Sequence, residues 1–110
     1  MTFQHRDLAA GRWYNLTFFE QMANVGAEIG RTVTWKEKGR PDYSRRAFER
    51  AVELLDLTVS DSRNRSRLRE LLRAREALVD HFVFDNSYQS TDESWLRYFH
   101  SFELAARANR

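Results

Sequence analysis

Apolar residues recur every three or four positions along four stretches of the chain, which is the spacing of one buried face of an α-helix. The pattern predicts helices over residues of about 12–38, 43–59, 62–84 and 91–108. Turn-forming residues fill the gaps between them, and no stretch shows the alternation typical of a β-strand. Because the connections are short, neighbouring helices are expected to run antiparallel. The sequence therefore predicts an all-α, four-helix up-and-down bundle in one domain over residues 1–110.

Small residues and capping residues refine this prediction. Four small side chains on the first helix are expected to let a neighbouring helix approach closely. Ser90 and Glu93 have the spacing of a capping box, which predicts that the last helix begins beside them. The small residues of the first helix are Ala23, Gly26, Ala27 and Gly30.

Composition excludes several classes of site and predicts self-association. The chain has no cysteine, which excludes disulfides, thiolate catalysis and cysteine-ligated zinc. No apolar stretch reaches the ~20 residues that span a bilayer, and the first residues lack the apolar core of a signal peptide, so a cytoplasmic protein without membrane contact is expected. Eight Phe, four Tyr and three Trp exceed what one small core needs. Part of this aromatic surface, including Trp13, Trp35 and Tyr88, is expected at a subunit contact, most simply in a homodimer.

Arg75 occupies an unusual position on the third helix. This helix is expected to turn one apolar stripe inward, formed by Leu68, Leu71, Leu72, Leu78, Val79 and Phe82. Arg75 lies in the middle of that stripe, and a buried guanidinium without partners costs on the order of several kcal/mol. One interpretation is a structural ion pair with Glu20, Glu28 or Glu103, or a charged group that extends to water. The other is an arginine that holds phosphate in a cleft or across a dimer interface.

A run of arginines leads up to Arg75 and consists of Arg63, Arg65, Arg67, Arg69 and Arg73. Cations in the first turns of a helix oppose the helix dipole, so helix stability does not explain the run. Contact with RNA phosphates explains it, and the alternative is a solvated face balanced by neighbouring carboxylates. Because the formal net charge of the chain is only +2, any nucleic-acid site is expected to be local.

His81 follows Arg75 by six residues, and its imidazole suits acid–base chemistry near neutral pH. A surface or interface histidine is the alternative. The segment Arg75–His81, with the sequence REALVDH, resembles the R-x(4–6)-H signature of the HEPN (higher eukaryotes and prokaryotes nucleotide-binding) superfamily. The turn and last helix that follow are similar in layout to small bacterial members. A six-residue step turns the two side chains about 120° apart on one helix, so the pair is expected to converge only across a two-fold axis.

The resemblance implies a dimeric, HEPN-like helical bundle whose paired motifs form a metal-independent RNA-cleaving cleft. Arg75 would stabilise phosphate charge there, and His81 would assist proton transfer at a ribose 2′-hydroxyl. The resemblance also implies a nucleotidyltransferase partner in a toxin–antitoxin module. Some members of the superfamily lack the motif and act only as non-catalytic binding partners.

Two functions follow from these observations. The first is a HEPN-like homodimer that binds and cleaves RNA, with catalytic Arg75 and His81 and with the arginine run on the RNA backbone. The second is a non-catalytic helical interaction or accessory module, homo-oligomeric, antitoxin-like or a nucleotidyltransferase partner. No cofactor is expected in either case. No metal site is predicted, because the spacing of His81 and Asp85 suits two ligands but no further ligand motif accompanies them.

Overall fold

The structure is a computed structural model that describes residues 11–108 of the chain. Its four long helices are α2 (Phe18–Glu37), α3 (Pro41–Ser60), α4 (Leu68–Val83) and α5 (Asp92–Ala108). Short 3₁₀ segments precede α2 and α4 and are η1 (Arg12–Asn15) and η2 (Ser62–Arg67). The part of the chain that is described contains no strand, so the prediction of an all-α protein with four helices is confirmed.

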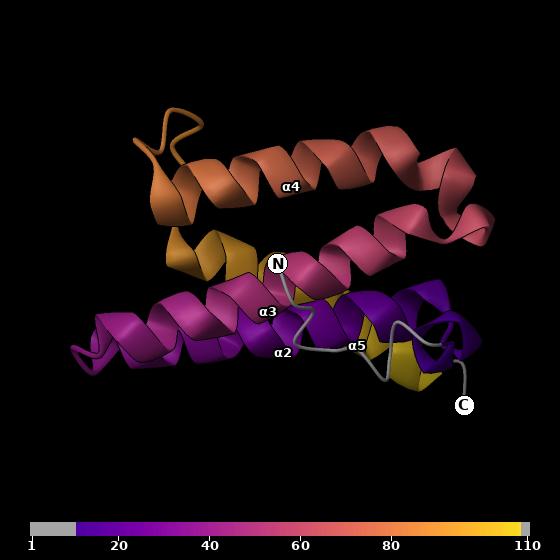
Figure 1. Ribbon diagram of the computed structural model, residues 1–110, viewed down its shortest axis with the longest axis horizontal. Coiled ribbons are helices and arrows are strands. Elements are labelled where there is room, and N and C mark those ends of the chain that lie inside the picture. Colours follow the sequence, from indigo (N-terminus) through magenta and orange to yellow (C-terminus); the bar gives the residue numbers. More distant parts are fainter. Residues whose placement is uncertain (1–10, 109–110) are drawn as a thin grey trace.

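Successive long helices run in alternating directions (Figure 1). α2 and α3 form an antiparallel pair, and α5 packs against α2. α4 lies at the edge of this arrangement, where its main helical neighbour is α3. One side of α4 consequently faces away from the rest of the bundle.

Local hydrogen bonds determine where α2 begins. Thr17 Oγ1 accepts a hydrogen bond from the backbone N–H of Glu20 at 3.1 Å, and Glu20 Oε1 accepts one from the N–H of Thr17 at 2.9 Å. This reciprocal capping box starts the helix at Phe18. The predicted start near residue 12 is wrong because Leu16 is extended, with φ −83° and ψ 149°, and the chain before it forms η1.

The predicted helix over 62–84 consists of two elements. Asp61 has an extended backbone, with φ −73° and ψ 117°, and its Oδ1 accepts the N–H of Arg63 at 3.0 Å. This side-chain cap opens the 3₁₀ turns of η2. The α-helix itself begins only at Leu68, so the arginines at 63, 65 and 67 do not lie on α4.

The capping box of α5 lies one residue beyond its predicted place. Thr91 Oγ1 accepts the N–H of Ser94 at 3.0 Å, and Ser94 Oγ accepts the N–H of Thr91 at 3.0 Å. Ser90 has a different role, because its hydroxyl accepts the indole N–H of Trp95 at 3.0 Å. The predicted pairing of Ser90 with Glu93 is therefore wrong, although the predicted helix is present.

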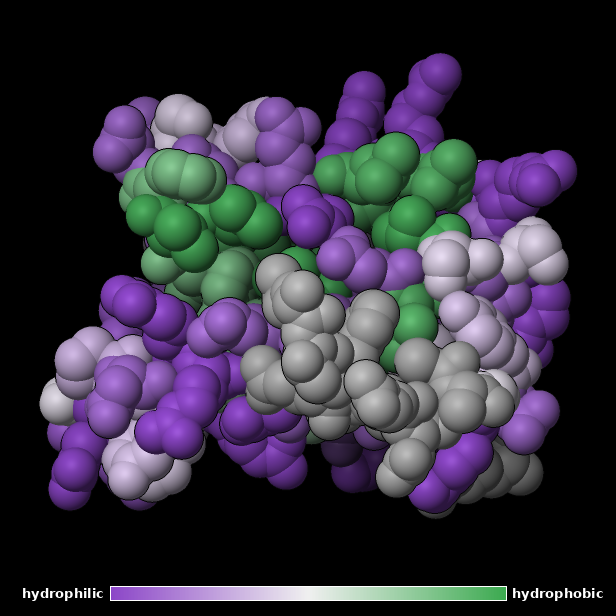
Figure 2. All heavy atoms as spheres, viewed as in Figure 1, coloured by the Kyte–Doolittle hydropathy of each residue, from purple (hydrophilic) through white to green (hydrophobic). Residues whose placement is uncertain are grey.

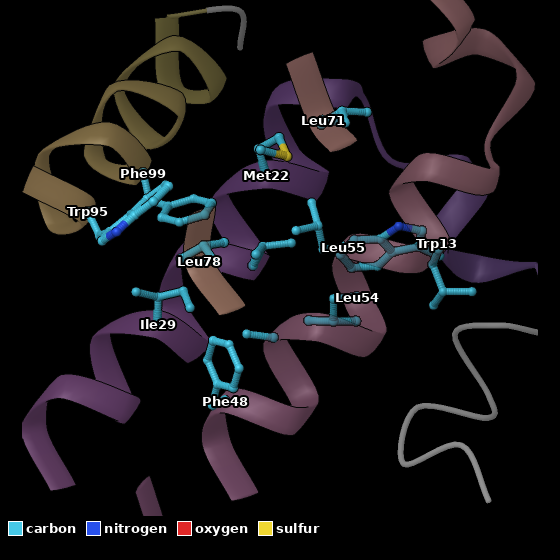
Figure 3. Close-up of a cluster of buried hydrophobic side chains, with 13 residues drawn as sticks. Trp13, Met22, Ile29, Phe48, Leu54, Leu55, Leu71, Leu78, Trp95 and Phe99 are labelled. Atoms are coloured by element: carbon cyan, nitrogen blue, oxygen red, sulfur yellow. The ribbon is translucent and has the colours of Figure 1, made fainter. Parts of the chain in front are cut away.

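All four helices and η1 contribute to one apolar core (Figure 3). Its members include Trp13, Met22, Ile29, Phe48, Leu55, Leu71, Leu78, Trp95 and Phe99. Trp13 was expected at a subunit contact, but it is fully buried and donates its indole N–H to Thr58 Oγ1 at 3.2 Å. That expectation is wrong because η1 sets the ring against α3. Trp35 is half-buried beside Tyr43, and Tyr88 is exposed.

A buried polar network joins the start of α2 to the turn after α3. Gln21 Nε2 donates to Asp61 Oδ2 at 2.9 Å and to the carbonyl of Trp13 at 3.1 Å. Asn64 Nδ2 donates to Gln21 Oε1 and to the carbonyl of Thr58, both at 2.9 Å. Buried amides need such partners, so these bonds fix the conformation of η2 against α2.

The small residues of α2 do not all have the predicted role. At Gly26 the prediction is confirmed, because Phe99 of α5 approaches the glycine directly. At Gly30 it is wrong, because an added Cβ would meet nothing within 4 Å. Of these two glycines, only Gly26 lies at the close approach of α2 and α5.

Candidate functional site

α4 carries two apolar rows, and only one of them faces the core. Leu71 and Leu78 are fully buried, whereas Leu68 is 38% and Leu72 is 47% exposed. The prediction that Leu68 and Leu72 point inward is wrong, because the core takes up the neighbouring row of the same helix. Val79 and Phe82 are partly buried against the core.

The second row forms a continuous face of the helix. Its members are three or four residues apart, so they lie above one another along α4. We call this row the outer face of α4; it comprises Leu68, Leu72, Arg75, Glu76, Val79 and Val83. Figure 2 shows two apolar patches on this side of the molecule, with polar residues between them. Exposed apolar patches of this kind are typical of surfaces that contact another protein.

The loop after α4 extends the outer face. Phe84 is 69% exposed, Tyr88 is 58% exposed, and together with Val79 they line a hollow of about 480 Å³. Asp80 holds this loop in place, because its carboxylate accepts the N–H of Tyr88 at 3.1 Å and the hydroxyl of Ser87 at 3.0 Å. The backbone hydrogen bond from Tyr88 contributes most to lowering the pKa of Asp80. The exposed rings are therefore presented by an anchored loop.

Arg75 pairs with Asp56 of α3. Its Nε donates to Asp56 Oδ1 at 2.7 Å, and Nη2 lies 3.5 Å from Oδ2. The hydrogen bond to this carboxylate raises the pKa of Arg75. The predicted ion pair is present, but its predicted partners are wrong, since Glu28 pairs with Arg50 and Glu103 with Arg107. Sequence reasoning missed Asp56 because its place on α3 gave no signal that it faces α4.

The Arg75 side chain is not buried, because 40% of it remains exposed. This exposure agrees with the alternative in which the charged group extends to water, and the contact with Asp56 agrees with a structural ion pair. The apolar row that contains Arg75 belongs to the outer face and not to the core.

His81 lies on the opposite side of α4. Only 8% of its side chain is exposed, and its Nε2 lies 2.7 Å from Asp92 Oδ1 at the start of α5. Lys36 Nζ lies 3.2 Å from Asp92 Oδ2, so the carboxylate joins α2, α4 and α5. Burial pushes the pKa of Asp92 upward, but the hydrogen bonds from His81 and Lys36 outweigh it and lower that pKa.

The structure does not bring Arg75 and His81 together within one chain. Arg75 bonds to α3, whereas His81 bonds to α5 and packs edge-on against Phe82. His81 Nδ1 is buried without a hydrogen-bond partner in the structure. His81 thus links α4 to α5 through Asp92, and it also lines a hollow together with Lys36 and Arg45.

Two members of the arginine run contact the start of α2. Arg63 donates to both oxygens of Asp61 and to the carbonyl of Leu16, and Arg67 lies over the ring of Phe18 with 4.2 Å to its centroid. These two arginines therefore hold η2 against the start of α2. All five members of the run are exposed, Arg63 and Arg67 included.

No group of three or more metal-ligating side chains occurs within residues 11–108. None of the helices described is both long and apolar enough to cross a membrane. Comparison with protein-family models, with curated proteins and with solved structures finds no match for this chain. Function is therefore inferred from the geometry of the chain itself.

Proposed function

We propose that this protein is a non-catalytic helical interaction module that associates with a second copy of itself through the outer face of α4. The observation that carries the proposal is the apolar row along that face, in which Leu68, Leu72 and Val83 are exposed although they keep helical spacing. Burying such side chains yields roughly 25 cal/mol for each Å² removed from water. One apolar row of α4 is already buried in the core. The second row gains the free energy of burial only if another molecule covers it.

The ribonuclease function implied by the HEPN resemblance has less support from the geometry. It needs Arg75 and His81 at one phosphate, either in one chain or across two chains. Arg75 is held by Asp56, and His81 is nine-tenths buried beside Asp92. His81 lines a hollow between α2, α3 and α4, whereas Arg75 lines a different hollow, beside the loop after α4.

Measurement of molar mass in solution tests the proposal. The wild-type chain is expected to show a concentration-dependent shift toward twice the chain mass by light scattering or sedimentation. Leu72→Glu places a charge in the outer face and is expected to weaken association by about tenfold or more, equivalent to ~1.4 kcal/mol or more.

Leu104→Glu provides the matched control. Leu104 lies on α5 and is 51% exposed, so this variant adds the same charge at a similarly exposed leucine elsewhere. It is expected to associate like the wild type. A wild-type chain that stays monomeric at every accessible concentration, or equal effects of the two variants, would refute the proposal.

A further inference from the structure

The outer face of α4 is symmetric in sequence about the midpoint between Arg75 and Glu76. Leu68 and Val83 are equally far from that midpoint along the helix, and so are Leu72 and Val79. A two-fold axis through the midpoint of two antiparallel helices would bring each residue opposite its counterpart. A two-fold contact uses the same patch on both copies, so it is stable only when these counterparts suit one another.

We infer that two copies of the chain pair through antiparallel α4 helices in this single register, an inference that rests on the proposed function. Leu68 then meets Val83 of the second copy, and Leu72 meets Val79, so apolar side chains face one another on both sides of the axis. Arg75 of each copy meets Glu76 of the other at the centre. The order of apolar, charged and apolar groups is therefore complementary to itself.

Charge selects the antiparallel orientation. Parallel pairing of the same faces would set Arg75 against Arg75 and Glu76 against Glu76, and like charges opposed across an interface are strongly unfavourable. Antiparallel pairing sets opposite charges together at both positions. It also aligns the two helix dipoles favourably. Arg75 and Glu76 thus lie at the midpoint of the outer face, where opposite charges are needed.

Arg75 can donate hydrogen bonds to Asp56 and to a carboxylate of a second copy at the same time. A guanidinium has five N–H donors, and the bond from Nε to Asp56 uses the inner edge while 40% of the side chain stays exposed. The contact with Asp56 holds the group in position for a second carboxylate. Glu76 is also exposed, and it lies close enough to the Tyr88 hydroxyl to raise the pKa of Tyr88.

Separate charge-reversal variants test the register. Pairs of Arg75→Glu chains set Glu against Glu, and pairs of Glu76→Arg chains set Arg against Arg. Each variant alone is expected to associate about tenfold or more weakly than the wild type. An equimolar mixture sets Glu against Arg at both central positions, so a mixed dimer is expected to regain most of the lost affinity. Sedimentation with one variant fluorescently labelled measures this dimer.

Disulfide cross-linking gives a second readout that does not depend on charge. The chain has no cysteine, so introduced thiols have no competitors. The double variant Leu72→Cys/Val79→Cys is expected to form a covalent dimer on mild oxidation. Either single variant is not, because its two thiols would lie about 10 Å apart along the helices, beyond the reach of a disulfide.

The outcomes separate the register from the proposed function, with the helix content of each variant checked by circular dichroism. A covalent dimer from the double variant alone, together with recovery in the charge mixture, supports the register. If Leu72→Glu abolishes association but neither result is seen, the register is wrong and the proposed function stands. If Leu72→Glu leaves association unchanged, both are wrong.

Discussion

Gly26 and Phe99 set the separation of α2 and α5. A Cβ at position 26 would lie 2.5 Å from the Cβ of Phe99, a distance that side chains do not adopt. Because both atoms are fixed to helix backbones, the contact is relieved only if the helices move apart.

Gly26→Ala is therefore expected to lower the free energy of unfolding by ~1–3 kcal/mol, since the overpacking outweighs the better helix propensity of alanine. Gly30→Ala on the same helix is the control, because open space surrounds that position. It is expected to raise the free energy of unfolding by up to ~1 kcal/mol. Urea unfolding of both variants measures the difference, and a loss of stability in Gly30→Ala equal to that in Gly26→Ala would disprove the explanation.

Asn64→Ala is expected to cost ~2 kcal/mol of unfolding free energy. The substitution leaves Gln21 Oε1 without this donor in a buried site, and it removes one of the two donors to the carbonyl of Thr58, which keeps the N–H of Asp61. Asn24→Ala is the matched control, because Asn24 donates only to the exposed carbonyl of Glu20. That change is expected to stay within about 0.5 kcal/mol of the wild type. Similar values for the two variants would mean that the buried network does not stabilise the fold.

The stability of the protein is expected to fall in acid as Asp61 takes up a proton. The hydrogen bond from Arg63 lowers the pKa of Asp61 from 3.8 to about 2 against the opposing effect of burial. The unfolded chain thus binds this proton more readily than the folded chain. The resulting stability, roughly 1–2 kcal/mol, is fully present above pH about 4 and is lost as the pH falls toward 2.

Asp61→Asn tests this assignment. The variant is expected to be less stable near neutral pH and to lose part of the acid dependence between pH 4 and 2, as measured by thermal unfolding at a series of pH values. Wild-type and variant profiles that differ by a constant offset would show that Asp61 does not cause the acid dependence.

The purified chain is expected not to cleave RNA in the presence of a metal chelator, because Arg75 and His81 bond to different helices. Incubation with end-labelled single-stranded RNA and separation of the fragments on a gel measures this. Cleavage that disappears in both Arg75→Ala and His81→Ala, with helix content unchanged, would contradict the proposed function and support the HEPN resemblance.

The periodicity of apolar residues was sufficient to predict the four helices, since their buried rows recur at the helical spacing. It did not predict η1 and η2, because the start of α2 and of η2 depends on side-chain caps at Thr17 and Asp61. The capping box of Thr17 and Glu20 could have been predicted from the sequence, because the two residues have the required spacing. The burial of Trp13 could not be predicted from the sequence, because it depends on contact with Thr58, which is far away along the chain.

Periodicity also could not tell which apolar row of α4 faces the core. Leu71 and Leu72 are adjacent in sequence, yet one is fully buried and the other is 47% exposed. Only the position of α3 and α2 relative to α4 decides between them. The same limit applies to Arg75, because periodicity places it in an apolar row but does not show that this row lies on the surface. The sequence also gave no indication that His81 contacts Asp92, because that contact depends on the turn that places the start of α5 beside α4.

Intermolecular contacts between methyl groups show directly whether two α4 helices pair through their outer faces. In a mixture of isotopically labelled and unlabelled chains, isotope-filtered nuclear Overhauser spectra record only contacts between copies. Antiparallel pairing of α4 predicts cross-peaks from Leu72 to Val79 and from Leu68 to Val83. Cross-peaks confined to the exposed leucines of α5, Leu96 and Leu104, or no intermolecular cross-peaks at all, would contradict it.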